Sequence, residues 1–89
     1  MLNIPAFCET NVFENTENKN NRVFLIADAD ESLFDSYEKL FLANGFEKKE
    51  GYALGAHRFA AYRNDTMAYF MNDFRTVREL SIVEEETSK

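Results

Sequence analysis

Two kinds of hydrophobic spacing divide the chain into a helical part and a β part. The helical part is an apolar stripe with intervals of one, three and four residues, formed by Leu33, Phe34, Tyr37, Leu40 and Phe41. This spacing places the side chains on one side of an α-helix. Asp30 supplies a carboxylate that can cap the first turn, and Gly45 allows the left-handed backbone that often ends a helix. The pattern therefore predicts a helix over residues 31–44.

The other apolar segments have the composition and alternation of β-strands. A continuous apolar run over residues 23–27 predicts a buried strand before the helix. After the helix, strands are predicted from residue 46 and over residues 58–63, 66–71 and 77–83. We expect residues 51–55, 64–65 and 73–76 to form the bends and turns between them, because Gly, Asn and Asp favour turns.

This order, β-α-β-β-β-β, predicts an α+β fold. We expect an antiparallel sheet of four to five strands, with the one main helix packed on one face of that sheet. Residues 1–21 are expected to form an N-terminal arm and an Asn-rich loop, since Asn competes with regular backbone hydrogen bonding. Residues 22–84 are expected to form the single domain, and residues 85–89 an acidic tail.

Composition limits the class of protein. The chain has 89 residues, of which 45% are hydrophobic, enough for one domain with a modest core. No window reaches the roughly 20 apolar residues of a membrane span, and the first residues lack the regions of a signal peptide. The single cysteine, Cys8, cannot form an internal disulfide. We therefore expect a cytoplasmic protein that does not bind membranes.

The acidity of the chain bears on its partners. A formal net charge of −6 disfavours direct binding to nucleic acid, whose phosphates carry the same sign. Two interpretations stay open: the charge serves solubility, or an acidic surface meets a basic protein. Acidic residues form two blocks, Asp28, Asp30, Glu31, Asp35 and Glu38 at the helix start, and Glu84, Glu85 and Glu86 near the end.

A second candidate binding surface is apolar. Met67, Tyr69 and Met71 occupy alternate positions and so share one face of their predicted strand. Tyr and Met are favoured at protein interfaces, while packing in the core is the alternative for these side chains. If the helix covers one face of the sheet, we expect these three residues and Tyr62 to line the exposed face.

No complete catalytic or metal-binding pattern occurs, and we predict no enzyme activity, no cofactor and no metal. Asp28 and Asp30 follow the apolar run in an Asp-x-Asp pattern that resembles the first motif of haloacid-dehalogenase-type phosphatases. That family also needs a downstream lysine, further acidic residues and a longer parallel sheet. The alternative roles are a turn residue and a helix cap. The only histidine, His57, has no nearby His or Cys with which to bind zinc.

Several short motifs resemble a known family. They are Phe34-Asp35-x-Tyr37, Leu40 with Asn44-Gly45-Phe46, residues 58–62 and residues 77–84. Residues 30–84, which contain these motifs, resemble a small domain at the start of some metallo-β-lactamase-fold hydrolases from gut Firmicutes. In that family the metal ligands lie in the following domain, for which these 89 residues have no counterpart. The resemblance therefore implies an accessory module and not a hydrolase.

Three functional hypotheses follow. The leading one is a non-catalytic acidic protein-binding module; one version inhibits a nucleic-acid-binding protein, by analogy with phage-encoded anti-CRISPR proteins. The second is an accessory or dimerisation domain, in which an exposed sheet edge pairs with another copy. The third is a phosphatase-like enzyme that uses Asp28 and Asp30.

Overall fold

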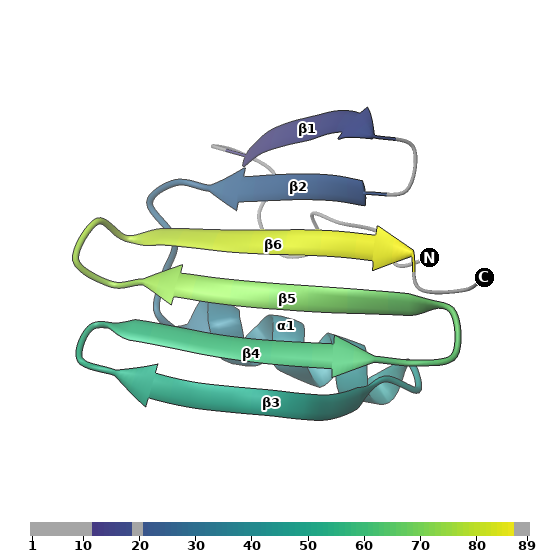
Figure 1. Ribbon diagram of the computed structural model, residues 1–89. Helices are drawn as coiled ribbons and strands as arrows, with labels where there is room; N and C mark the ends of the chain where they lie inside the picture. The colour runs from purple at the N-terminus through teal and green to yellow at the C-terminus, as the bar shows by residue number, and fades with distance from the viewer. Residues whose placement is uncertain (1–11, 19–20, 87–89) are drawn as a thin grey trace.

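The described residues form a six-stranded antiparallel sheet with one helix on one of its faces (Figure 1). The computed structural model describes residues 12–18 and 21–86. The elements are β1 (Val12–Asn18), β2 (Asn21–Ile26), α1 (Ser32–Ala43), β3 (Glu47–Leu54), β4 (His57–Arg63), β5 (Met67–Phe74) and β6 (Glu79–Glu86). The predicted α+β class is confirmed, with six strands in place of the expected four to five.

The strand order is β1-β2-β6-β5-β4-β3, and every neighbouring pair is antiparallel. The chain leaves β2, passes through α1 behind the sheet and returns at the far edge as β3 (Figure 1). A meander of β3 to β6 then brings β6 beside β2. The described part of the chain contains no helix with the length and apolarity needed to cross a bilayer.

The prediction of a polar loop before the domain is wrong for residues 14–18, which belong to β1. This strand pairs with the free edge of β2, with an irregular register between Asn15 and Asn18. Its polar, Asn-rich sequence has little strand propensity, so the pairing depends on the neighbouring strand and not on local preference. Val12 and Phe13 also belong to β1, and residues 1–11 of the predicted arm, including Cys8, lie outside the described residues.

Three other boundaries differ from the prediction. Strand β3 continues through Gly51 to Leu54 instead of bending, with a register shift between Lys48 and Glu50. A Cβ atom on Gly51 would lie 2.7 Å from the Lys48 side chain, so this glycine permits a close approach inside a strand. Strand β5 includes Phe74, and the following turn occupies residues 75–78. Strand β6 reaches Glu86, so the expected acidic tail begins within the sheet.

The predicted helix is confirmed and begins at Ser32. The cap position is Glu31, whose side chain makes no capping bond, so the expectation that Asp30 caps the helix is wrong. The Asp30 carboxylate, one residue earlier, still accepts a hydrogen bond from the Ser32 amide at 2.9 Å. At the other end, Gly45 has a φ of 84°. The amide of Phe46 then donates to the Phe41 carbonyl at 3.1 Å, and Phe46 folds back under the last turn.

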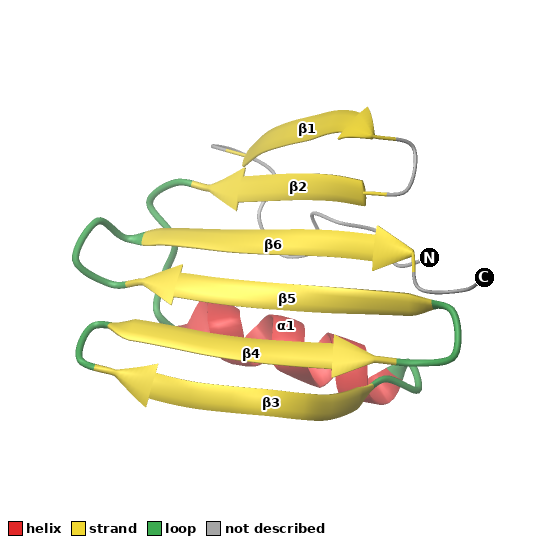
Figure 2. Cartoon of the chain, in the orientation of Figure 1, coloured by secondary structure: helices red, strands yellow, loops and turns green. Residues whose placement is uncertain are grey.

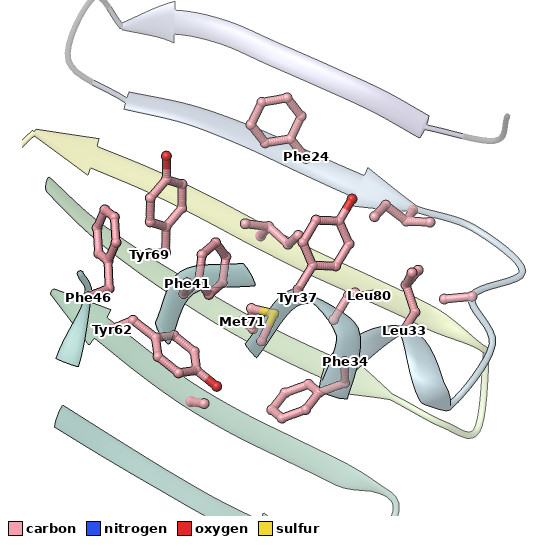
Figure 3. Close-up of a cluster of buried hydrophobic side chains, with 14 of the residues drawn as sticks. Phe24, Leu33, Phe34, Tyr37, Phe41, Phe46, Tyr62, Tyr69, Met71 and Leu80 are labelled. Carbon is pink, nitrogen blue, oxygen red and sulfur yellow. The ribbon is translucent and has the colours of Figure 1, made fainter. Parts of the chain in front are cut away.

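Aromatic rings form the centre of the core between α1 and the sheet (Figure 3). The Phe41 ring stacks on Tyr69 with centroids 4.6 Å apart, and lies 5.0 Å from Tyr62 and 6.2 Å from Phe46. Phe41, Tyr62 and Tyr69 are fully buried. Tilted and offset ring pairs of this kind add to the free energy gained by burial. Phe41 therefore joins the helix to β4 and β5.

A buried carboxylate holds the start of α1 against the sheet. Asp73 is 1% exposed and accepts hydrogen bonds from Arg58 and Arg75, each at 2.9 Å. Arg58 also donates to the Glu31 carbonyl at 2.9 Å, and Arg75 to the Ala29 carbonyl at 3.0 Å. A buried charge needs such pairing, and here it links two strands to the residues that lead into the helix.

The Phe41→Ala variant should lower the free energy of unfolding by about 3–5 kcal/mol, because it empties the centre of the core. Leu42, the next residue, is 48% exposed, so Leu42→Ala should cost well under half as much. Urea unfolding followed by circular dichroism measures both. Equal losses in the two variants would contradict the packing described.

Candidate functional site

The helix covers one face of the sheet, and no described element covers the other (Figure 2). The burial of β6 shows the division, because Leu80, Ile82 and Glu84 are buried while the residues between them are partly exposed. Side chains alternate between the two faces of a strand, so the pairing registers assign every described strand residue to a face. We call the face opposite α1 the open face.

Aromatic side chains gather at one corner of the open face. Tyr52 stacks on its cross-strand neighbour Phe59 with centroids 5.3 Å apart. His57 stacks on its own neighbour Phe74 at 4.8 Å, with the rings only 6° from parallel. An edge-to-face contact joins the two pairs, because the Tyr52 and His57 rings have centroids 5.7 Å apart and planes at 89° to each other. We call these four residues and Leu54 the aromatic corner.

The aromatic corner is open to solvent. Leu54 is 73% exposed, Tyr52 53% and Phe74 39%. Val77, in the turn after β5, is also exposed, and it lines a shallow depression together with Leu54, His57 and Phe74. Exposed apolar residues are common one at a time, but a contiguous patch of them marks an interaction surface. The corner has the amphipathic rings that interfaces favour.

One polar contact fixes the orientation of the corner. The Nε2 atom of His57 lies 2.9 Å from the Asn72 Oδ1 atom, at hydrogen-bond distance. Asn72 is the neighbour of Phe59 across β4 and β5, so the contact crosses the strand pair diagonally. The imidazole is thereby held flat against Phe74, and the aromatic corner is formed before any partner arrives.

The apolar surface continues from the corner across the sheet. Phe70 on β5, Val83 on β6 and Val23 on β2 are consecutive cross-strand neighbours on the open face. Leu25 and Phe13 continue the surface to β1, and Phe13 is 63% exposed. The candidate surface therefore crosses the whole sheet and is not a single cavity.

Glutamates border this apolar surface. The charged residues assigned to the open face in β3 to β6 are Glu47, Glu50, Arg63, Glu79 and Glu85. Four of these five carry negative charge, so the border has the sign of the whole chain. The open face combines an apolar centre with an acidic border.

The predicted sheet-face residues lie on the other side of the sheet. Tyr62, Tyr69 and Met71 are fully buried and Met67 is 8% exposed, so the expectation that they line the exposed face is wrong. They share a face, as predicted, but it is the one that α1 covers. The reason is chemical as well as steric, since the Tyr62 hydroxyl donates to Glu38 of the helix and the Tyr69 hydroxyl to Glu84.

The acidic residues at the helix start have mixed environments. Asp28, Asp30, Glu31 and Asp35 are exposed, and the Asp30 carboxylate bonds Ser32. Asp35 lies 3.6 Å from Arg58. Glu38 is partly buried, where desolvation raises the pKa of its carboxyl, but hydrogen bonds from Tyr62 and Lys48 offset this and leave the pKa below its ordinary value.

The second acidic block does not form one surface. Glu85 and Glu86 are in β6, but Glu84 is 2% exposed and faces the helix side. The expectation that Glu84 binds at the surface is wrong, because Arg22 donates to its carboxylate at 2.6 and 2.9 Å and Tyr69 at 2.5 Å. Asp28, which follows β2, also lies at the opposite end of the sheet from Glu85, since Glu85 pairs with Asn21 while Ile26 pairs with Leu80. Glu38 instead reaches Tyr62, which is in the same cross-strand row as Glu84.

The proposed phosphatase residues have structural surroundings. Asp28 is exposed in the turn after β2 with a φ of 55°, and Asp30 bonds the backbone and hydroxyl of Ser32. The described strands are antiparallel throughout, unlike the parallel sheet of the phosphatase family. Within the described ranges, no group of three or more His, Cys, Asp or Glu side chains comes together to hold a metal ion.

Sequence reasoning missed the aromatic corner because Tyr52 and Leu54 were assigned to a bend and Phe74 to a turn. One signal could have found two of them. Glu50, Tyr52 and Leu54 alternate with small residues, as strand residues on one face do. His57, considered above only as a zinc ligand, lies between Tyr52 and Phe74.

The buried ion pair predicts a pH dependence. Burial by itself raises the pKa of Glu84, but hydrogen bonds and charge from Arg22, with the Tyr69 hydroxyl, outweigh it and lower the pKa below its ordinary value. A lowered pKa in the folded state means that the stabilisation is present above the ordinary pKa and is lost as the pH falls through the folded-state pKa. Glu84→Gln should therefore cost about 2 kcal/mol at neutral pH and progressively less below about pH 4.

Urea unfolding of both proteins at neutral and acidic pH measures this difference. Glu86→Gln, an exposed residue of the same strand, is the matched control and should change stability little at either pH. A Glu84→Gln cost that stays the same at acidic pH would contradict the assignment.

Comparison with known proteins does not place the chain in a family. No protein-family model, curated protein or solved structure matches it. The resemblance of residues 30–84 to accessory domains of metallo-β-lactamase-fold hydrolases therefore stays a prediction.

Proposed function

We propose that the protein is a non-catalytic binding module that docks another protein on its open face. The observation that carries this proposal is the aromatic corner, in which Tyr52, Leu54 and Phe74 are exposed side by side. Each of these side chains has an apolar body that a partner would remove from water at a gain of about 25 cal/mol per Å². Tyrosine and other aromatic residues are the usual anchors of protein interfaces.

The order of the surface also supports docking. The stacked ring pairs and the contact between His57 and Asn72 hold the aromatic corner in one arrangement on adjacent strands. A surface that is already ordered loses little conformational entropy when a partner binds. Strands are rigid supports, so the corner presents a fixed shape.

Two kinds of partner remain as narrower hypotheses. One is a basic protein that the module inhibits, such as a nucleic-acid-binding protein, and the net charge of −6 supports it. The other is a neighbouring enzyme domain, as the metallo-β-lactamase resemblance implies, and the large open face supports it. Both use the same surface, because an accessory domain also has to cover exposed apolar residues.

Site-specific photocrosslinking tests the docking surface. The full chain with p-benzoylphenylalanine in place of Tyr52 should give discrete crosslinked products in extracts of the source cells after irradiation. The matched control carries the same group in place of Leu42, which is exposed on the helix side. The control should give none of those products, and Leu54→Ser in the Tyr52-labelled chain should reduce them about tenfold.

Equal crosslinking from Tyr52 and Leu42, or no effect of Leu54→Ser, would show that the open face is not the docking surface. Products from the Leu42 position alone would move the site to the helix side.

A further inference from the structure

The charges on the open face indicate what kind of partner it accepts. Glu79 and Glu85 lie six residues apart in β6, which is about 20 Å at roughly 3.3 Å per residue. They therefore border the apolar surface at opposite ends of one strand. Glu50 lies on the same face in the edge strand β3, in the row that also contains Phe70 and Val83.

Five of the described cations form ion pairs with residues other than Glu50, Glu79 and Glu85. Arg22 pairs with Glu84, Arg58 and Arg75 with Asp73, and Lys48 with Glu38, all on the side that α1 covers. Lys49 pairs with Glu47 at 2.6 Å. Among the described residues, none of these pairs involves Glu50, Glu79 or Glu85. Arg63 also lies on the open face, opposite Glu47, and it lines one depression with Lys49, Glu50 and Glu85. The open-face glutamates outnumber this arginine four to one, so a surplus of negative charge faces a partner.

This charge pattern argues against several occupants. An anionic membrane surface or a nucleic acid would bring more negative charge to the glutamate border. A second copy would place one acidic open face against another, with a formal net charge of −6 on each chain. Both kinds of occupant would meet repulsion around the apolar contact.

The sheet edges are unsuited to an added strand. The outer strand β3 begins with Glu47, Lys48, Lys49 and Glu50 and contains a register shift between Lys48 and Glu50. The other outer strand, β1, carries acidic residues and has a register shift of its own. Charged residues and bulges on edge strands prevent pairing with further strands. A partner therefore approaches the face of the sheet and not its edge.

A helix fits a flat sheet face, as α1 shows on the covered side. The strands of seven or eight residues are about 25 Å long, which is the length of a helix of roughly 16 residues. A helix on the open face would bury the apolar side chains that are exposed there, as α1 buries those of the covered face. Its apolar side chains would recur at intervals of three and four residues.

We propose that the open face binds a cationic amphipathic helix of a partner protein. The apolar stripe of that helix lies across the aromatic corner and Phe70, and its Lys or Arg side chains lie against Glu50, Glu79 and Glu85. This inference rests on the proposed function, since it names the partner of the same surface. The apolar contact supplies affinity, and the glutamates select the sign of the partner's charge.

Two synthetic helical peptides of about 16 residues serve as probes. They share one leucine stripe, and one has lysine and the other glutamate at the flanking positions. Fluorescence anisotropy with the full chain should show the lysine peptide binding at least tenfold more tightly at about 50 mM NaCl. Its affinity should fall several-fold at about 300 mM NaCl, because salt screens the exposed charges.

Two double variants with the same loss of charge locate the contact. Glu50→Gln with Glu85→Gln should weaken the lysine peptide by about tenfold and reduce its salt dependence. Asp28→Asn with Glu31→Gln removes two exposed charges near the helix start and should change the affinity less than twofold. Equal effects of the two variants would overturn the proposal, because net charge and not the open face would then govern binding.

Leu54→Ser separates this proposal from the docking function itself. If it weakens both peptides alike, and the two peptides bind equally well at both salt concentrations, the docking surface stands and the cationic partner is overturned. If neither peptide binds, or if Leu54→Ser changes nothing, both proposals fail.

Preferential binding to anionic vesicles over the lysine peptide would overturn the helix partner. So would a dimer that forms with rising concentration in sedimentation and is lost in Leu54→Ser.

Discussion

In the part of the chain that the structure describes, one helix of 12 residues packs on a sheet of six strands and covers only one of its faces. The packing of Phe41 against Tyr62 and Tyr69 determines which face that is. Once those rings are buried, every alternate strand residue is directed to the core, and every residue between is directed to the open face. The exposed aromatic corner is therefore a consequence of the same contact that stabilises the fold.

Buried polar groups strengthen that choice of face. The Tyr62 hydroxyl donates to Glu38 and the Tyr69 hydroxyl to Glu84, while Asp73 accepts from Arg58 and Arg75. The bond from Tyr62 to Glu38 and the bonds from Arg58 and Arg75 to the Glu31 and Ala29 carbonyls would be lost if the sheet presented its other face to the helix. An unpaired buried polar group is costly. The open face needs no hydrogen bond from the helix, because its polar contact joins two of its own residues, His57 and Asn72.

The helix and the α+β class could be predicted because their signals are local: an apolar stripe, an aspartate that bonds the first helical amide, and Gly45. The surface could not, because alternation identifies residues that share a face without identifying the face that is covered. Strand β5 carries large apolar side chains on both faces, with Tyr69 and Met71 on one and Phe70 and Phe74 on the other. Residues distant in sequence determine which of the two faces is covered. The Tyr69 hydroxyl donates to Glu84, and Glu84 in turn pairs with Arg22.

Exposure to a soluble paramagnetic agent, followed by NMR, tests the central claim without any knowledge of the partner. Signals from the Leu54 methyl groups and the Tyr52 and Phe74 rings should be strongly attenuated. The Met71 methyl group and the Tyr69 ring, which are fully buried, should keep their intensity. Strong attenuation of Met71 and Tyr69 with protection of Leu54 would show that the helix covers the opposite face, and the aromatic corner would then belong to the core.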